Sequence, residues 1–562
     1  MGSVGELAQR VWDYRLATSP FLQLRAGVPI TKIRSGSLAE LEADAAFAST
    51  ILAELDALDP STVAHDDELT RGFLRFSLQS VVDDPKSYWL QFGVTPYSTF
   101  ELTYTVHSYF GTHQFDGPDD VERYLRLLAD FRDELTEKRN KLVGQRERGI
   151  LLSRPAIPGS RDSLTRHRGA AASLGAIDPA RLSSLSESDR LRLEASASTF
   201  VAAELLPAFD LLIGTFDAGY EAEAPDGVGF AQYPGGVEFY RSMVRLHTAS
   251  DCPAEEIHAM GLAEVAALTE QMASARADMG FTGTEAEFHQ QLATDPRCFA
   301  KDAAEVEARY LGHMARLEPK IGDYFSVLPK APYGVARLAA EMEAGVTYGY
   351  YQVPTPSDEV GRYMYNGSDL DKRSLLTSAA LILHELAPGH HFHMARQSEN
   401  TALPEIRKQA MEIGAFNEGW AEYAAGLGWE MGLYDDPLDR YGRLVHERFT
   451  AQRLVIDTGM NLLGWTLERA REYMAANTTE SPVQIESETL RYSTDLPGQA
   501  LSYRFGYLEL MRLRAFAEKE LGEAFDIRGF HETILGPGAL PFPVIDHNVQ
   551  TWISTQRAEA QT

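Results

Sequence analysis

Apolar residues recur at intervals of three and four positions along most of the chain, a pattern typical of amphipathic helices. The segment 37–58 shows this pattern, and Ser37 stands where an N-cap residue is expected. The segment 253–279 begins with Pro-Ala-Glu-Glu and ends before Gly280, as helices with an early proline and a C-terminal glycine do. The same periodicity predicts helices at 120–147, 187–214, 302–317, 373–387, 405–431, 437–475 and 502–521.

Strand patterns are confined mostly to one short region. Residues 345–356 and 362–367 are rich in Tyr, Val and Thr and are punctuated by Gly and Pro. We expect them to form an antiparallel pair with a loop at 355–361. This pair lies just before a cluster of histidines, so a small antiparallel sheet is expected beside the active-site cleft.

The organisation expected from these patterns is a mainly α fold with two lobes. Residues 152–186 are rich in Pro, Gly, Ser and Arg and are expected to form a long surface loop. Residues 1–220 are predicted to form an N-terminal helical lobe. Residues 221–562 are predicted to form the lobe that carries the chemistry.

The charge balance excludes several kinds of partner. The chain has 81 acidic and 52 basic residues, a net charge of −29. Nucleic acids and anionic membrane surfaces both require clustered Lys and Arg, so we expect neither as a partner.

The cysteines and the N-terminal sequence favour the cytoplasm. Cys252 and Cys298, the two cysteines, lack the spacing of zinc ligands and are expected to be free thiols. We find no signal-peptide pattern in the N-terminal MGSVGELAQRVWDYRL. The apolar stretch 379–383 is far shorter than the roughly 20 residues that span a bilayer. We therefore expect a cytoplasmic protein.

Four of the fifteen histidines lie within the segment LLTSAALILHELAPGHHFHMARQ (375–397). The known helical motif H-E-x-x-H places two zinc-binding imidazoles one turn apart, with the glutamate as general base. Here His384 and Glu385 are followed by His390, six residues after His384 instead of four. A regular helix would rotate His390 by about 240° and move it about 9 Å along the axis. A regular helix would therefore not form the site.

Pro388 and Gly389 offer a departure from the regular helix. Pro388 has no N–H for the carbonyl of His384, and Gly389 tolerates unusual backbone angles. A bulge at this point would bring His390 beside His384. His391 is the competing ligand, but it lies about two turns from His384, so the bulge would have to absorb a larger distance.

A catalytic zinc site needs a third protein ligand and an open position. The segment AFNEGWAEYAAGLGWE (415–430) predicts a second helix that carries Glu418, our candidate for this ligand. Gly419 would allow another backbone or a metal to approach closely. Glu422, one turn further, is either the ligand instead or a residue that orients a histidine from behind.

Several motifs resemble, in sequence and in order, those of the bacterial family called domain of unknown function 885. The resemblance covers about residues 230–553. The motifs are PGGVEFYRSMVRLHTASDCPAEEIHAMGLAEV (234–265), HELAPGHH (384–391), NEGWAEYA (417–424), LPGQALSYRFG (496–506) and GFHETILGPGALPFPVID (529–546).

That family is grouped with the gluzincin metallopeptidases, which combine a His-Glu helix, a second histidine and a downstream glutamate ligand. The resemblance therefore implies a two-lobed, helical, metallopeptidase-like fold, one zinc ion per chain and hydrolysis of peptide bonds. Ala425 stands where the family often has an acid. This departure argues against a supporting role at that position.

The mechanism that follows is hydrolysis by a metal-activated water molecule. His384, His390 and Glu418 are the expected zinc ligands, and Glu385 is the expected general base. A zinc-dependent peptidase is the favoured function. The alternatives are a metal-dependent hydrolase or lyase acting on a non-peptide small molecule, and a catalytically silent metal-binding scaffold.

Further residues are candidates for contacts with the substrate. Tyr503 is the candidate donor to the developing oxyanion, with core packing as its alternative role. Arg504 is the candidate for binding a substrate carboxylate. Tyr365 and Asn366 are candidates for backbone pairing with an extended peptide.

Overall fold

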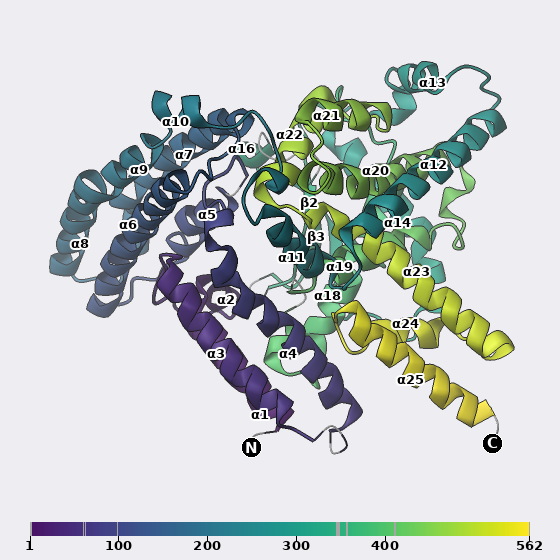
Figure 1. Cartoon of the computed structure of the whole chain (residues 1–562), viewed down its shortest axis with the longest axis horizontal. Coiled ribbons are helices and arrows are strands. Elements are labelled where there is room, and N and C mark those ends of the chain that lie inside the picture. Colours follow the sequence, from purple (N-terminus) through teal and green to yellow (C-terminus); the bar gives the residue numbers. More distant parts are fainter. Residues whose placement is uncertain are drawn as a thin grey trace.

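The computed structural model describes residues 3–59, 61, 63–97, 99–343, 349–355, 358–409 and 412–560. Most of them lie in helices, and three short strands form one small sheet near the middle of the molecule (Figure 1). The prediction of a mainly helical chain with a small sheet is therefore confirmed.

The chain begins with four helices, and side-chain capping bonds mark the starts of the first and the third. Ser3 accepts a hydrogen bond from the amide of Glu6, and the Glu6 carboxylate accepts one from the amide of Ser3. Ser37 accepts from the amide of Glu40, which confirms it as an N-cap. The helices are α1 (Val4–Thr18), α2 (Pro20–Arg25), α3 (Leu38–Asp56) and α4 (His65–Asp83).

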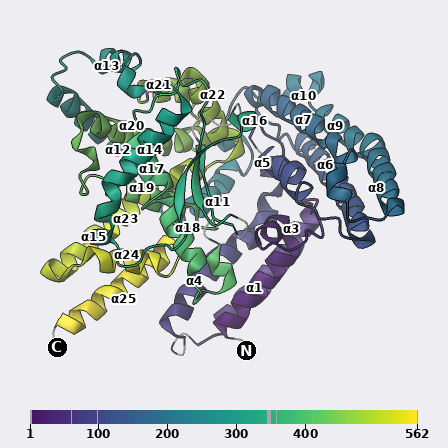
Figure 2. The same cartoon turned by 180° about the vertical axis from the view of Figure 1, so that it is seen from behind.

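Six further helices form a group of their own on one side of the molecule (Figures 1 and 2). Their buried apolar side chains belong to one cluster, which runs from Ile30 to Ala224. The side chains of α1, α3 and α4 belong to a larger cluster that continues to Ile553. The six helices are α5 (Thr99–Thr103), α6 (Pro118–Glu147), α7 (Ile157–Ala171), α8 (Glu187–Phe200), α9 (Leu206–Ile213) and α10 (Ala218–Glu223).

These clusters bear on the predicted lobes. The smaller cluster ends near the predicted boundary at residue 220, but the first helices of the chain pack with the second half. The boundary itself stays a prediction.

The surface loop expected at 152–186 is wrong. This segment contains α7 and three short 3₁₀ turns. Pro158 occupies the first turn of α7, where a missing N–H costs nothing, and Ile157 and Leu164 are buried. The proline that suggested a loop therefore starts a helix.

The second half of the chain holds the sheet and the remaining helices. The predicted helices at 253–279, 302–317 and 502–521 match α12, α14 and α23 closely. The helices are α11 (Gly236–Thr248), α12 (Ala254–Asp278), α13 (Glu285–Leu292), α14 (Ala303–Leu317), α15 (Ile321–Tyr324), α16 (Ala340–Glu343), α17 (Ser378–Glu385), α18 (His390–Glu399), α19 (Gly414–Gly426), α20 (Pro437–Asn461), α21 (Leu467–Ala476), α22 (Pro482–Leu490), α23 (Ser502–Leu521), α24 (Ile527–Leu535) and α25 (Phe542–Ala560).

Two predicted helices were too long. The segment 437–475 divides into α20 and α21, because the chain turns at Gly464, which has a φ of +66°. Of 405–431, residues 414–426 form α19, residues 405–408 form a 3₁₀ turn, and residues 410–411 lie outside the described residues.

The sheet has the strand order β1-β3-β2, and its strands are β1 (Tyr333–Arg337), β2 (Gly349–Gln352) and β3 (Gly361–Tyr365). β2 pairs antiparallel with β3, as predicted, and residues 345–348 and 356 of the first predicted strand lie outside the described residues. β1, which the sequence analysis missed, pairs parallel with β3. The sheet is therefore mixed, and β3 is its central strand.

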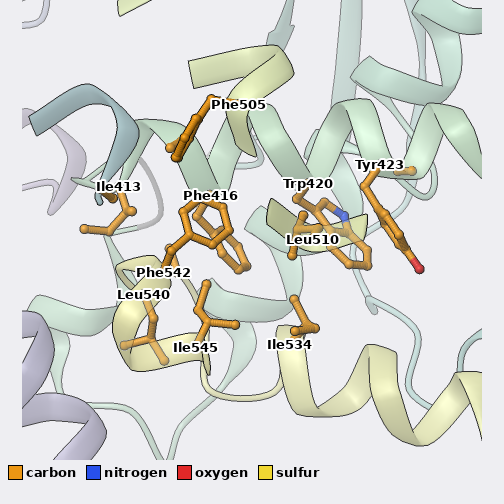
Figure 3. Packing of buried hydrophobic residues seen from close by; sticks show 14 of the residues in the cluster. Ile413, Phe416, Trp420, Tyr423, Phe505, Leu510, Ile534, Leu540, Phe542 and Ile545 are labelled. Carbon is orange, nitrogen blue, oxygen red and sulfur yellow. The ribbon is translucent and has the colours of Figure 1, made fainter. Parts of the chain in front are cut away.

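Helices α19 and α23 cross in backbone contact. A Cβ on Gly419 would lie 2.5 Å from the Cα of Gly506, so neither position has room for a side chain. Beside this crossing, Phe416, Trp420 and Tyr423 of α19 pack with residues of α23, α24 and α25 (Figure 3). Gly419 was expected to allow close approach of a backbone or a metal, and the structure shows the approach of the α23 backbone.

Among the described residues, one helical stretch is long and apolar enough, by length and composition, to cross a membrane. It runs from Glu187 to Glu223. Leu193, Ala197 and Leu205 of this stretch lie in the buried core of the N-terminal group. A single stretch of this kind is weak evidence, because core helices meet the same criterion.

We predict that Gly419→Ala lowers the free energy of unfolding by about 1–3 kcal/mol, because the added methyl group forces two helix backbones apart. Urea unfolding followed by circular dichroism measures the change. The control is Gly312→Ala in α14, where an added Cβ meets no atom within 4 Å. That variant is expected to gain about 0.5–1 kcal/mol from helix propensity. Equal stability of Gly419→Ala and the parent would contradict the crossing.

Candidate functional site

The two histidines of the candidate site lie on different helices. α17 ends at Glu385 and α18 begins at His390, so the expected bulge in one continuous helix is a complete break. Gly389 lies against the carbonyl oxygen of His384, where a Cβ would not fit. The chain therefore folds back tightly, and α18 starts beside the end of α17.

Trp420 of α19 stabilises the break between α17 and α18 with a hydrogen bond. Its indole is fully buried, and its Nε1–H donates to the carbonyl oxygen of Pro388 at 2.8 Å. A buried carbonyl in a helix break needs a donor from elsewhere, because no helical partner is in reach. Trp420 supplies it from the same helix that carries Glu418.

His384, His390 and Glu418 converge on one point. The imidazole rings of His384 and His390 are 4.7 Å apart between centroids and nearly perpendicular. The Nε2 atom of each ring lies 3.4 Å from Oε2 of Glu418. The three potential ligand atoms all lie within 4.8 Å of one another, and both histidines are buried. The arrangement is that of a candidate metal centre.

Opposite charges support this group. Burial disfavours the charged form of His384, but the carboxylates of Glu418 and Glu422 outweigh it and raise the pKa of His384 to about 10. Burial alone would raise the pKa of Glu418, but the two imidazoles outweigh it and lower that pKa below its ordinary value. Oε2 of Glu418 is buried and makes no hydrogen bond to the described residues. An anionic oxygen without a donor is suited to a cation.

Glu422 orients His384 from the far side of the ring. Its Oε1 lies 3.0 Å from Nδ1 of His384, and its Oε2 lies 3.1 Å from Nη1 of Arg443. A carboxylate behind a histidine fixes the ring and makes it a better ligand. This geometry corresponds to the orienting role considered for Glu422.

His446 of α20 is a residue of the candidate site that the sequence analysis missed. Its Nε2 lies 2.6 Å from Oε1 of Glu422, the oxygen that also faces His384. Burial lowers the pKa of His446, so a neutral ring donates to the carboxylate. His384, Glu422 and His446 also form a group that could hold a metal, but 2.6 Å is a hydrogen-bond distance. The available signal was His446 three residues after Arg443 and beside Glu447, in a helix of largely buried residues.

A chain of alternating charges leads from Glu422 to α12. Arg443 donates to Glu447 at 2.8 Å, and Arg504 donates to Glu447 at 3.0 Å and to Glu264 at 2.8 Å. Arg504, 4% exposed, is thus occupied by two carboxylates. The geometry assigns it to this internal network and corrects its expected role in binding a substrate carboxylate.

Glu385 lies at the edge of the group, partly exposed. Burial raises its pKa, the nearby Glu418 raises it further, and His384 and His390 oppose the shift. The backbone amide of Tyr351 in β2 also bonds to its carboxylate. A glutamate with a raised pKa is suited to accept a proton near neutral pH.

His391 uses both of its ring nitrogens away from this convergence. Nε2 of His391 lies 3.0 Å from the carbonyl oxygen of Ala331, so it carries the proton, and Nδ1 accepts from the hydroxyl of Tyr351 at 2.9 Å. Both nitrogens are thus used to join α18 to the sheet, which rules out His391 as the second ligand in this arrangement. His393 is buried beside His390, with ring centroids 5.8 Å apart.

Tyr365 and Asn366 do not face a substrate. Tyr365 lies in β3, which is paired on both sides, so its backbone is not free for a peptide. Its hydroxyl donates to the carbonyl oxygen of Ala303, and the Asn366 amide donates to the carbonyl oxygen of Glu343. Both expected substrate contacts are therefore corrected to structural ones, and among the described residues β1 and β2 are the outer strands of this sheet.

Tyr503 of α23 lies against the candidate centre. Its ring is stacked with that of His384 at 6.1 Å between centroids. Burial, with the charge of Glu418 adding to it, raises the pKa of Tyr503 to about 12. The phenol therefore keeps its proton at neutral pH and can donate it in a hydrogen bond.

The fold and this cluster define a mainly helical protein with a His/Glu candidate metal centre. The model of the family described as bacterial protein of unknown function (DUF885) matches residues 20–549, and the chain belongs to this family. A search of curated proteins found no match.

Solved structures share the fold. A protein from Colwellia psychrerythraea, described provisionally as a lipoprotein, aligns with a TM-score of 0.85 at 22% identity, covering 98% of this chain and 99% of that one. A provisional lipoprotein of unknown function from Shewanella oneidensis has a TM-score of 0.73 at 17% identity, covering 97% and 99%. A provisional oligoendopeptidase F from Bacillus anthracis reaches a TM-score of 0.28 at 11% identity, too low to indicate a shared fold.

We predict that Trp420→Phe lowers the free energy of unfolding by about 1–3 kcal/mol, because the carbonyl of Pro388 loses its buried donor. Chemical unfolding measures the difference. Trp552→Phe, which removes the same ring volume where Trp552 packs against Phe525 and Phe530, is the control and is expected to cost less. A smaller loss for Trp420→Phe than for the control would contradict this role.

Proposed function

We propose that this protein is a zinc-dependent hydrolase, with peptides as its substrates. The single observation that carries the proposal is the convergence of His384, His390 and Glu418 beside the partly exposed Glu385. Two imidazoles and a carboxylate, with a fourth position left open, are the ligand set of several catalytic zinc sites.

The spacing of the three side chains fits a metal ion. Zinc bonds of 2.0–2.2 Å at tetrahedral angles put neighbouring ligand atoms about 3.3–3.5 Å apart. The two distances from Glu418 Oε2 to the imidazole nitrogens are both 3.4 Å, longer than an ordinary hydrogen bond.

The candidate residues divide the chemistry of hydrolysis among them. A zinc ion held there would lower the pKa of a bound water to about 7 and polarise a carbonyl. Glu385 takes a proton from the attacking water, whose oxygen adds to the carbonyl carbon. Tyr503 donates a hydrogen bond to the carbonyl oxygen as negative charge develops. When the C–N bond breaks, Glu385 passes the proton to the leaving amine.

Substrates other than peptides fit the same chemistry. A hydrolase or lyase acting on a small molecule would use the same ligands, and a silent scaffold would use the metal without Glu385. The cytoplasmic location inferred from the sequence gains no support from the two similar structures, which are described provisionally as lipoproteins.

We predict that protein purified without chelator holds about one zinc per chain, and that a chelator abolishes hydrolysis. His384→Ala should lower both zinc content and hydrolysis. Glu385→Gln should keep the zinc while turnover falls by about 10²-fold or more, the scale of a lost general base. Elemental analysis and digestion of a peptide library measure both quantities.

The outcomes separate the candidate functions. Full peptide hydrolysis by Glu385→Gln would refute the mechanism, even with zinc bound. Zinc without hydrolysis of any peptide in the parent would favour a small-molecule substrate or a scaffold. Protein that neither contains nor takes up a divalent metal would refute the proposal as a whole.

We predict that His446→Ala weakens zinc binding by about 10- to 100-fold, because Glu422 loses a donor that holds it behind His384. His446→Gln, whose amide can still donate, should restore most of the affinity. The control is His258→Ala in α12. The ring that it removes bonds at 2.8 Å to Thr458, which lies on α20, the helix that carries His446. Competition with a zinc-binding dye measures the affinity, and parent-like binding by His446→Ala would disprove the role.

A further inference from the structure

The arginines around the candidate centre differ in how fully they are paired. Arg443 and Arg504 each bond to two carboxylates. Arg453 bonds to Glu488 at 2.9 Å and to the hydroxyl of Tyr492 at 2.8 Å. These three cations have internal partners and hold the helices together.

Arg491 is different. Its Nη2 donates to the side-chain oxygen of Gln499 at 2.8 Å, but its Nη1 is 3.7 Å from Glu488, beyond hydrogen-bond distance. Its Nε is buried without a hydrogen-bond partner among the described residues. The side chain is 24% exposed, so a ligand can reach it. Arg491 thus keeps donors that the chain does not use.

The position of Arg491 connects it to the candidate centre. Its partner Gln499 lies one helical turn before Tyr503, whose ring stacks on His384. The guanidinium of Arg453 lies 4.6 Å from the centroid of the Tyr503 ring. Two guanidinium groups therefore lie on the side of the centre formed by Tyr503.

The backbone departs from a regular helix at Arg491, and a loop of the N-terminal half lies nearby. Arg491 begins a π-helical turn, Arg491–Asp495, at the end of α22. Such turns often occur at functional sites, because they displace one side chain from the regular helix. From the N-terminal half, Tyr97 donates to the hydroxyl of Ser487 at 2.9 Å. Arg491 thus lies where the two halves of the chain meet.

We propose that Arg491 binds the free C-terminal carboxylate of a peptide substrate, so that the enzyme removes short fragments from the C-terminal end. A planar guanidinium with unused N–H groups matches a carboxylate, which can accept two of them at once. Arg453 and Arg491 share the carboxylate of Glu488, Arg453 at 2.9 Å and Arg491 at 3.7 Å. This inference rests on the proposed function, because it assumes that the candidate centre cleaves peptides. The scissile bond would lie between Tyr503 and that centre.

Binding of matched peptides tests the inference without turnover. The probes are two N-acetylated pentapeptides of alanine and phenylalanine, one ending in a free carboxylate and one in an amide. Calorimetry measures their Kd for zinc-treated Glu385→Gln protein, with and without Arg491→Gln. The carboxylate peptide should bind about 10- to 100-fold more tightly than the amide, and Arg491→Gln should remove this preference.

Two variants control for charge and fold. Arg491→Lys keeps the charge without the planar fork and should retain only part of the preference. Arg471→Gln removes a partly exposed arginine of α21 that pairs with Glu486 at 3.2 Å, and the preference should stay unchanged. Thermal unfolding checks that each variant is folded. If Arg491→Gln is unfolded, Arg491→Lys is used for the test instead.

The results distinguish this inference from the proposed hydrolysis. Equal binding of the two peptides, no binding of either, or a preference that survives Arg491→Gln would overturn the carboxylate site. A preference that depends on Arg491, in a protein that binds no zinc and hydrolyses nothing, would support the carboxylate site while refuting the hydrolase.

Discussion

The close approach of Gly389 to the end of α17 is the constraint on which the candidate site depends. It lets two histidines that are six residues apart share one point, which no continuous helix permits. The break would be costly alone, because it leaves a buried carbonyl without a helical partner. The indole N–H of Trp420 donates to that carbonyl and so offsets the cost. The same side chain therefore packs α19 into the core and stabilises the break that forms the site.

Around this point the protein places charge in layers. Glu418 faces both imidazoles, Glu422 backs His384, and Arg443 with His446 holds Glu422 in turn. Each layer limits the movement of the one inside it. A buried carboxylate is tolerable here because every one has a cation, a donor or another ligand group within reach. The network is therefore both the support of the candidate centre and the source of its negative character.

How much of this could be predicted from the sequence depends on the range of the interactions. Local patterns predicted α12, α14 and α23, and residue types in order pointed to His384, His390 and Glu418. The histidine spacing did not reveal whether the helix bulges or breaks, because Gly389 and Trp420 act together only in the fold. Arg504 was misjudged since its partners Glu264 and Glu447 come from distant helices. His446 was missed for the same reason, and β1 because its partner strand follows it by more than twenty residues.

The crossing of α19 and α23 has a mechanical consequence. Glu418 directly precedes Gly419, and Tyr503 lies one turn before Gly506, so both side chains stand at the place where the two backbones touch. Close-packed helices move as a single body, since sliding would drive backbone into backbone. The anionic ligand candidate and the phenol therefore keep a fixed separation throughout any opening or closing.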